Sequence, residues 1–119
     1  MKHFQISEFD SPDIPGSGES MNLLFLDLLD AIREDAKIPF IINSGFRTPS
    51  YNALKKVGGK PNSAHLKGLA ADISAKTSSE KFKIVYSAIK FGVLRIGIGS
   101  NFIHLDNDLS LPHPVIWTY

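Results

Sequence analysis

A histidine and an aspartate lie seven residues apart in a segment of mostly small side chains, residues 63–73 (SAHLKGLAADI). A strand that begins near residue 69 would bring Asp72 back beside His65 in the preceding loop. Gly68 and the alanines around it leave room for close backbone approach and for a bound group. Taken alone, the pair also fits a solvated loop histidine and an aspartate at the end of a strand.

A second histidine and a second aspartate occur in the sequence FIHLD, residues 102–106. Side chains two residues apart in a strand point to the same face, so His104 and Asp106 share one face while Ile103 and Leu105 share the other. Buried charged groups are usually paired or bound to a metal, so this pair indicates a functional face. An edge strand with one solvated face is the alternative interpretation.

Two imidazoles and one carboxylate, from His65, Asp72 and His104, match the ligand set of a catalytic zinc ion, which leaves a fourth position for water. The chain has no cysteine, so any metal must be bound through nitrogen and oxygen. It also has no HExxH motif, which excludes the common metalloprotease helix.

A third segment, residues 44–52 (SGFRTPSYN), places Arg47 in a turn directly after an apolar, β-branched run. The planar guanidinium of arginine suits a substrate carboxylate or a carbonyl that is being polarised. An ordinary surface charge is the alternative interpretation of Arg47.

Apolar periodicity and capping signals predict the helices that support these segments. A stripe over residues 25–36 predicts a helix with Ser20 as its N-cap. Pro49 suits the first turn of a short helix over residues 49–57. A capping box of Thr77 and Glu80 predicts a further helix that ends near residue 89. The side chains expected to face inward from that helix are Phe82, Val85 and Ile89.

Short apolar runs predict the strands, at residues 38–43, 69–74, 93–99, 101–107 and 115–119. Helices dominate the first half of the chain and strands the second, which predicts an α+β fold with a small, largely antiparallel sheet. A length of 119 residues corresponds to about one domain, so we expect a single domain over residues 1–119.

Composition excludes several classes of function. Apolar residues make up 43% of the chain and charged residues 21%, close to the globular average. The formal net charge of +1 is unlike that of a nucleic-acid binder or a polybasic membrane-surface protein. No apolar run approaches the ~20 residues that span a bilayer, and the first residues lack the apolar stretch of a signal peptide.

The three segments, in this order, resemble the peptidase M15 family, the zinc D-Ala-D-Ala carboxypeptidases and endopeptidases that cut peptidoglycan stem peptides. The most specific match is the pattern S-x-H-x-x-G-x-A-x-D from Ser63 to Asp72. The SGxRTPxYN segment adds to it, whereas HxD alone is weak. The chain is most similar to the compact branch with an HxD ending, found in bacterial and phage proteins, and the resemblance covers residues 4–117.

The resemblance implies the hedgehog/DD-peptidase fold, with zinc bound by His65, Asp72 and His104. It also implies that Arg47 contacts the backbone or the terminal carboxylate of the substrate, and that Ser63 lies near the substrate. The expected activity is therefore zinc-dependent hydrolysis of an amide bond in a peptidoglycan peptide, by a monomer.

The sequence departs from the family pattern at the general base. Many members carry a glutamate or aspartate three residues before the second zinc histidine, where this chain has Asn101. Asp106 is the remaining carboxylate on the face of His104. We expect Asp106 to act as the general base that takes the proton of the zinc-bound water. The alternative is that Asp106 holds a zinc ligand in place.

Two other functions stay open. One is a non-catalytic, zinc-containing module that binds peptidoglycan or a protein. The other is a metal-free interaction domain in which these side chains are incidental. Without a signal peptide, we expect synthesis in the cytoplasm. Cytoplasmic synthesis conflicts with a substrate that lies outside the cytoplasmic membrane. A phage lysis enzyme that is released or delivered to the wall would resolve the conflict, and so would an enzyme that acts on recycled wall peptides. A phage or prophage origin is favoured.

Overall fold

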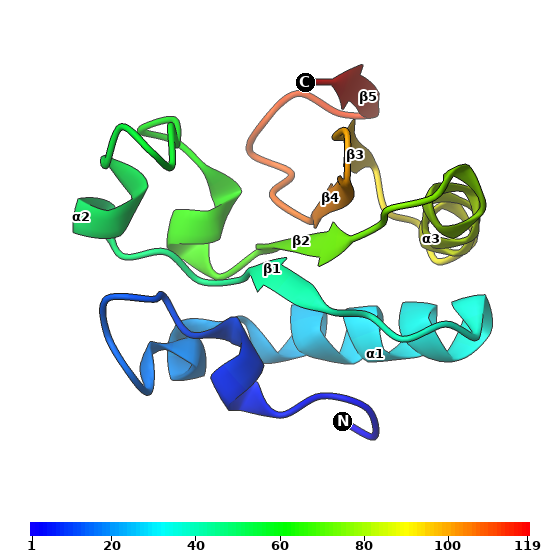
Figure 1. Ribbon diagram of the computed structural model, residues 1–119, viewed down its shortest axis with the longest axis horizontal. Coiled ribbons are helices and arrows are strands. Elements are labelled where there is room, and N and C mark those ends of the chain that lie inside the picture. Colours follow the sequence, from blue (N-terminus) through cyan, green and yellow to red (C-terminus); the bar gives the residue numbers. More distant parts are fainter.

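Five strands form one sheet in the computed structural model, which describes residues 1–119 (Figure 1). The strand order is β1-β2-β4-β3-β5, and all neighbours are antiparallel except β3 and β5. The strands are β1 (Ile42–Ser44), β2 (Ala70–Ser74), β3 (Arg95–Ile98), β4 (Phe102–Asp106) and β5 (Val115–Thr118). The α-helices are α1 (Leu23–Ala36), α2 (Pro49–Asn52) and α3 (Ser78–Lys90). Short 3-10 turns span Ile6–Phe9, Ser17–Ser20 and Ala64–Lys67. The expected α+β class with a largely antiparallel sheet is confirmed.

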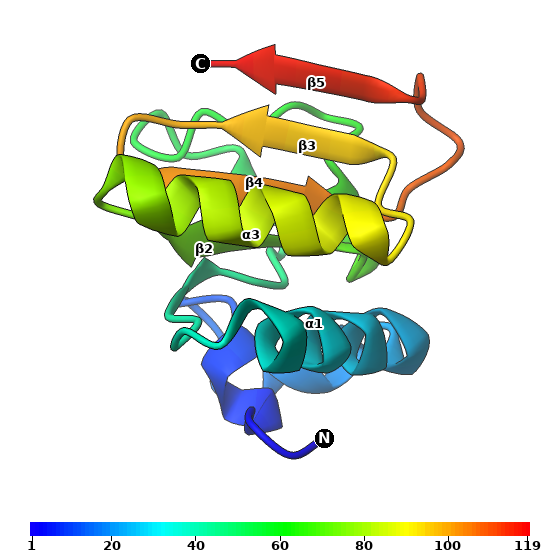
Figure 2. The same cartoon turned by 90° about the vertical axis from the view of Figure 1, so that its right-hand side faces the viewer.

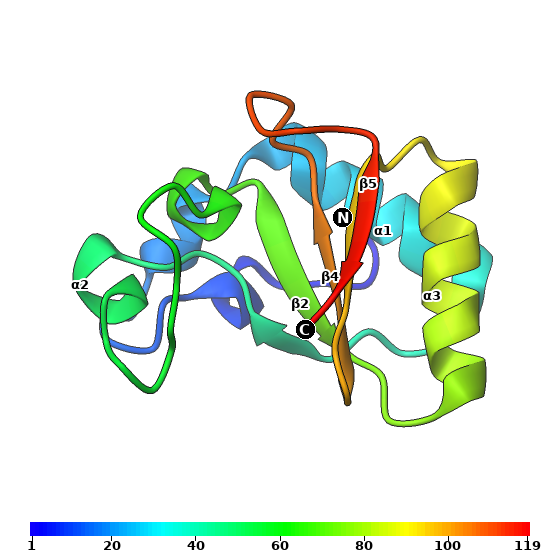
Figure 3. The ribbon, with the colours of Figure 1, turned by 90° about the horizontal axis from the view of Figure 1, so that it is seen from above.

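The two long helices lie on one side of the sheet. Helix α3 runs along β4 and β3, and α1 packs beside α3 (Figure 2). The chain from residue 45 to residue 68, including α2, lies on the opposite side (Figure 3). The sheet therefore has one face buried against helices and one face that can carry polar side chains.

The apolar core fills the space between the sheet and the two long helices. Alternation along each strand sends one set of side chains into this space. The buried sheet residues are Ala71, Ile73, Ile96, Ile103 and Leu105, and the helices add Phe25, Leu29, Ile32, Ile84 and Ala88.

The other face of the sheet carries a row of residues that crosses all five strands. Backbone pairing places Ser44 opposite Asp72, Asp72 opposite His104, His104 opposite Gly97, and Gly97 opposite Trp117. Because directly paired residues share a face, Asp72 and His104 lie side by side. A Cβ atom at Gly97 would come within 2.8 Å of the Trp117 indole, so the missing side chain lets Trp117 lie across β3 toward His104.

Three predicted boundaries were wrong for local reasons. The N-cap of α1 is Asn22 rather than Ser20, and its side chain accepts a hydrogen bond from the N–H of Phe25. Of the predicted strand 38–43, only residues 42 and 43 lie in β1, which continues to Ser44. The earlier residues are left out because β2, the one strand that pairs with β1, ends at Ser74. Helix α2 ends at Asn52 instead of residue 57. It ends early because the chain folds back after Asn52, whose side-chain amide donates a hydrogen bond to the carbonyl oxygen of Lys60.

Helix α3 turns a different face inward from the one predicted. Its capping box is confirmed at Thr77, and the helix ends at Lys90, close to the expected position. The side chains of Phe82 and Ile89 are exposed, and Val85 is partly buried. The buried positions are Ile84, Ser87 and Ala88. Apolar residues occupy two adjacent stripes of this helix, so periodicity alone did not decide which stripe faces the sheet.

None of the helices combines the length and the apolar character needed to cross a membrane.

Candidate metal centre and active site

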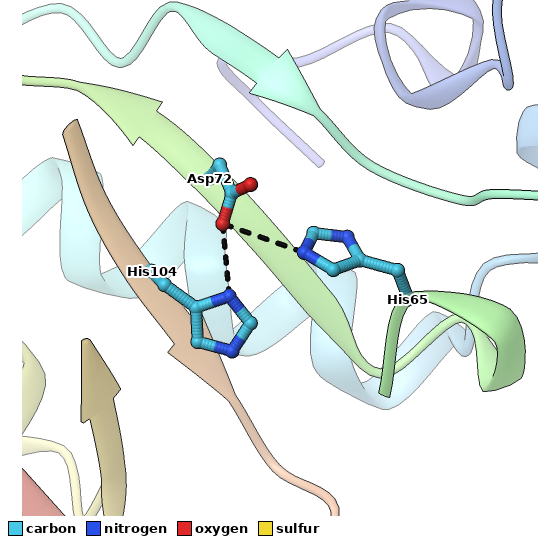
Figure 4. Close-up of side chains that lie close together, drawn as sticks. All are labelled: His65, Asp72 and His104. Atoms are coloured by element: carbon cyan, nitrogen blue, oxygen red, sulfur yellow. Dashed lines mark hydrogen bonds and ion pairs between the residues drawn. The ribbon is translucent and has the colours of Figure 1, made fainter. Parts of the chain in front are cut away.

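Three side chains that are distant in sequence converge on the polar face of the sheet. His65 comes from the 3-10 turn before β2, Asp72 from β2 and His104 from β4. Both imidazoles point at the same oxygen of Asp72 (Figure 4). The Oδ1 atom of Asp72 lies 2.8 Å from Nδ1 of His104 and 3.4 Å from Nε2 of His65. One potential ligand atom from each residue lies within 4.8 Å of the others.

The turn that carries His65 is fixed at both ends. The Ser63 hydroxyl accepts a hydrogen bond from the N–H of His65 at its start. Gly68 ends it with φ +68°, a left-handed conformation that favours glycine. A Cβ atom at Gly68 would lie only 2.4 Å from the carbonyl oxygen of Ser20. Both observations explain why the family pattern has a glycine at this position.

A backbone contact determines which nitrogen of His65 is free. Nδ1 lies 2.7 Å from the carbonyl oxygen of Gly45, and a carbonyl only accepts, so Nδ1 carries the proton. In the neutral imidazole, Nε2 is then an acceptor, and it faces a carboxylate oxygen of Asp72. Two facing acceptors call for a cation between them, and a metal ion fulfils that requirement.

His104 is held from the side away from His65. Its Nε2 lies 2.7 Å from Oδ2 of Asp106, which is only 1% exposed. The second oxygen of Asp106 accepts hydrogen bonds from Nε of Arg95, at 2.8 Å, and from the N–H of Asp108. Both carboxylate oxygens of Asp106 are thus engaged. A carboxylate that accepts the second N–H of a ligating histidine is the usual support of a metal site.

Arg47 lies against the other oxygen of Asp72. Its Nη2 is 3.3 Å from Oδ2 of Asp72, while Nε and Nη1 donate to the Ser44 hydroxyl and the Asn52 amide oxygen. The Arg47 side chain is only 13% exposed. The guanidinium is therefore preorganised beside the three converging side chains.

The protonation of His65 and Asp72 suits a metal centre, whereas His104 has to give up a proton when a metal binds. Burial lowers the pKa of His65, so this imidazole is neutral near pH 7. Burial also acts to lower the pKa of His104, but hydrogen bonds to Asp106 and Asp72 outweigh it and raise that pKa. Burial acts to raise the pKa of Asp72, yet the two imidazoles hold it well below its usual range. A metal replaces the Nδ1 proton of His104, so metal binding strengthens as the pH rises through that pKa.

The donor set fits zinc. Two imidazole nitrogens and one carboxylate oxygen form the protein share of a catalytic zinc site. The remaining ring nitrogen of each histidine already has an acceptor, the Gly45 carbonyl for His65 and the Asp106 carboxylate for His104. These contacts leave Nε2 of His65 and Nδ1 of His104 turned toward Asp72.

A cleft of about 740 Å³ opens over the three residues. Residues 57–60 and 62–64 line one part of it, together with Arg47. Aromatic side chains of Phe102, Trp117 and Tyr119 line another part, and the Trp117 ring lies 5.4 Å from the His104 ring. A cleft of this size accommodates a small peptide.

The predicted site residues divide into those that line the cleft and those that do not. The cleft is lined by all six predicted residues, namely Arg47, Ser63, His65, Asp72, His104 and Asp106. Asn101 lies outside it, in the turn between β3 and β4. Exposed His113 bonds only the Leu111 carbonyl through its side chain.

The sequence analysis identified neither Arg95 nor Trp117 as a site residue, and both line the cleft. The sequence offers one signal for Arg95, which is the only charged residue of the run 93–99. Its position opposite Asp106 follows from the hairpin register that the structure shows.

The sheet, the cleft and the three converging side chains define a candidate metal centre in an α+β domain. A family model described as Peptidase M15 matches residues 3–106. That range covers most of the chain, which therefore belongs to the peptidase M15 family. A comparison with curated proteins found no significant match. Membership suggests a metal-dependent peptidase with activity toward cell-wall peptides.

Proposed function

We propose that this chain is a single zinc domain over residues 1–119 that hydrolyses an amide bond in peptidoglycan stem or cross-link peptides, as a D-Ala-D-Ala carboxypeptidase or endopeptidase. The observation that supports it best is the convergence of His65, Asp72 and His104 in the cleft, each histidine with its second nitrogen already hydrogen-bonded. Family membership supports the same reaction class.

His65, Asp72 and His104 would hold the zinc ion. When bound, zinc supplies Lewis-acid activation of water and of the scissile carbonyl. Arg47 would bind the carbonyl or terminal carboxylate of the substrate, because its guanidinium is already oriented beside Asp72. Fixing the scissile group in this way converts binding into orientation. Ser63, on the cleft wall, would contact the peptide backbone.

Asp106 would hold His104 rather than act as the base, since its contacts support the second of the two roles open to it. Both of its oxygens are engaged by His104, Arg95 and the N–H of Asp108. A general base needs an oxygen within reach of the water that it deprotonates. A side chain that is 1% exposed and already bonded at both oxygens is better suited to orienting His104.

Asp106→Asn tests that role. The asparagine keeps an oxygen for His104 but presents an N–H₂ group where Arg95 now donates, so the support of His104 weakens. We expect zinc affinity to fall about 10–100-fold, with most of the hydrolytic rate restored at saturating zinc. Zinc competition with a chromophoric chelator and single-turnover cleavage measure the two effects.

Asp108→Asn is the matched control for that variant, because Asp108 is also buried and paired with a cation, Lys67, but does not contact His104. Its zinc affinity should match that of the wild type. A loss of roughly 10²–10⁴-fold in the rate of Asp106→Asn at saturating zinc, with unchanged affinity, would instead make Asp106 the base.

Digestion of purified peptidoglycan and of defined stem peptides tests the proposed activity. Mass spectrometry of the products should show a new amine and a new carboxylate at one peptide bond. The reaction should stop with a chelator and resume with added zinc. Intact substrate after incubation with fully zinc-loaded protein would reject hydrolysis.

One observation favours a second candidate function, a zinc-containing binding module without catalysis. Asp72 and Asp106 are the only acidic side chains that line the cleft, and both are engaged. Binding of peptidoglycan fragments by zinc-loaded protein without cleavage would support this candidate.

A further inference from the structure

Arg95 occupies a largely buried position at the start of β3. In the sheet, β3 lies between β4 and β5 (Figure 2). The Arg95 side chain is 12% exposed. It makes three contacts: Nε donates to Oδ1 of Asp106, Nη1 donates to the carbonyl oxygen of Pro112, and the guanidinium lies 5.0 Å from the centre of the Trp117 ring. A single side chain thus joins β4, the loop that follows it and β5.

The contact with Asp106 extends to the metal centre. Asp106 accepts from Arg95 with Oδ1 and from Nε2 of His104 with Oδ2. While Oδ1 is held by Arg95, the carboxylate presents Oδ2 to His104. The imidazole then keeps its proton on Nε2. Nδ1, which is now hydrogen-bonded to Oδ1 of Asp72, is the nitrogen that would bind a metal.

We propose that Arg95 is a positioning residue of the metal centre, which acts through Asp106 to fix the ring orientation and the tautomer of His104. The inference rests on the proposed zinc site, and it gives a role to a residue outside the three family segments. Arg95 is not a ligand. Its influence on the metal passes through two hydrogen bonds in series.

The chain contains a matched control for this role. Arg33 also donates to a backbone carbonyl, that of His3, and lies 4.9 Å from the centre of an aromatic ring, that of Phe4. Arg33 belongs to α1 and has no contact with the metal centre. A purely structural contribution from Arg95 would resemble that of Arg33, whereas a positioning role predicts a difference in metal binding.

The experiment compares Arg95→Met with Arg33→Met. Methionine keeps much of the aliphatic contact with the neighbouring ring and removes the guanidinium. For Arg95→Met we expect zinc affinity to fall about 10–100-fold and the visible spectrum of the Co²⁺-loaded protein to change. Arg33→Met should keep the wild-type affinity and spectrum. Arg95→Lys keeps the charge but not the planar fork, and should recover part of the affinity.

A double-variant cycle tests whether Arg95 acts through Asp106. In an Asp106→Asn background, Arg95→Met should cause little further loss of zinc affinity. This double variant also leaves no unpaired buried carboxylate, so it carries the test if Arg95→Met alone does not fold.

Wild-type affinity and an unchanged Co²⁺ spectrum in Arg95→Met would overturn the proposal. The proposal would also be overturned if Arg95→Met lowered zinc affinity equally in the wild-type and the Asp106→Asn backgrounds, because Arg95 would then act independently of Asp106. Failure of the wild-type protein to bind zinc would instead reject the proposed function. The failure of this inference and the failure of the proposed function are therefore distinguishable.

Discussion

Replacing His65 or His104 with alanine is expected to abolish zinc binding and hydrolysis together. Each histidine would supply one of only three protein ligands, and two ligands do not form a catalytic zinc site. Zinc content should fall from about one ion per chain to near zero, and cleavage of peptidoglycan peptides should fall to the background rate. Elemental analysis and product mass spectrometry measure both quantities on the same sample.

The fold should survive these two substitutions. In His65→Ala the Gly45 carbonyl loses its partner, which costs about 1–3 kcal/mol for a buried group. His113→Ala is the matched control, because His113 is exposed and lies outside the cleft. Its zinc content and activity should equal those of the wild type. Wild-type zinc content in both His65→Ala and His104→Ala would show that the metal is bound elsewhere.

Arg47→Lys is expected to reduce hydrolysis far more than stability. Lysine keeps the positive charge beside Asp72 but loses the planar fork that now reaches Ser44, Asn52 and Asp72 at once. A substrate group held less accurately reacts more slowly, and misplacement by about 1 Å can cost about 10²-fold in rate. Steady-state kinetics on a defined stem peptide, with zinc content and melting temperature measured in parallel, test this expectation.

Arg33→Lys is the control for Arg47→Lys, since it makes the same change on α1, away from the cleft. Its kinetics should be those of the wild type. Unchanged turnover in Arg47→Lys, together with unchanged zinc content and melting temperature, would show that Arg47 does not orient the substrate.

The sequence predicted the converging residues because their signals are local. Strand alternation places His104 and Asp106 on one face. The pairing of β2 with β4, which sets Asp72 directly opposite His104, is a long-range contact that the structure adds. The family pattern around His65 has a local cause as well, in the left-handed Gly68 that ends the turn.

Other features depend on contacts that no local pattern contains. The engagement of Asp106 by Arg95 requires the register of the β3–β4 hairpin, and that register determines which role its carboxylate can take. The inward face of α3 was mistaken because both of its apolar stripes satisfy helical periodicity. Only packing against α1 and β4 selects Ile84 and Ala88 over Phe82 and Ile89.

The most direct test of the zinc centre is the metal content of the wild-type protein. Protein purified without chelators, reloaded with zinc and freed of excess metal should contain about one zinc ion per chain by elemental analysis. The double variant His65→Ala/His104→Ala, prepared in the same way, should contain no zinc. A reloaded wild-type protein with no zinc would contradict the assignment of His65, Asp72 and His104 as a metal centre.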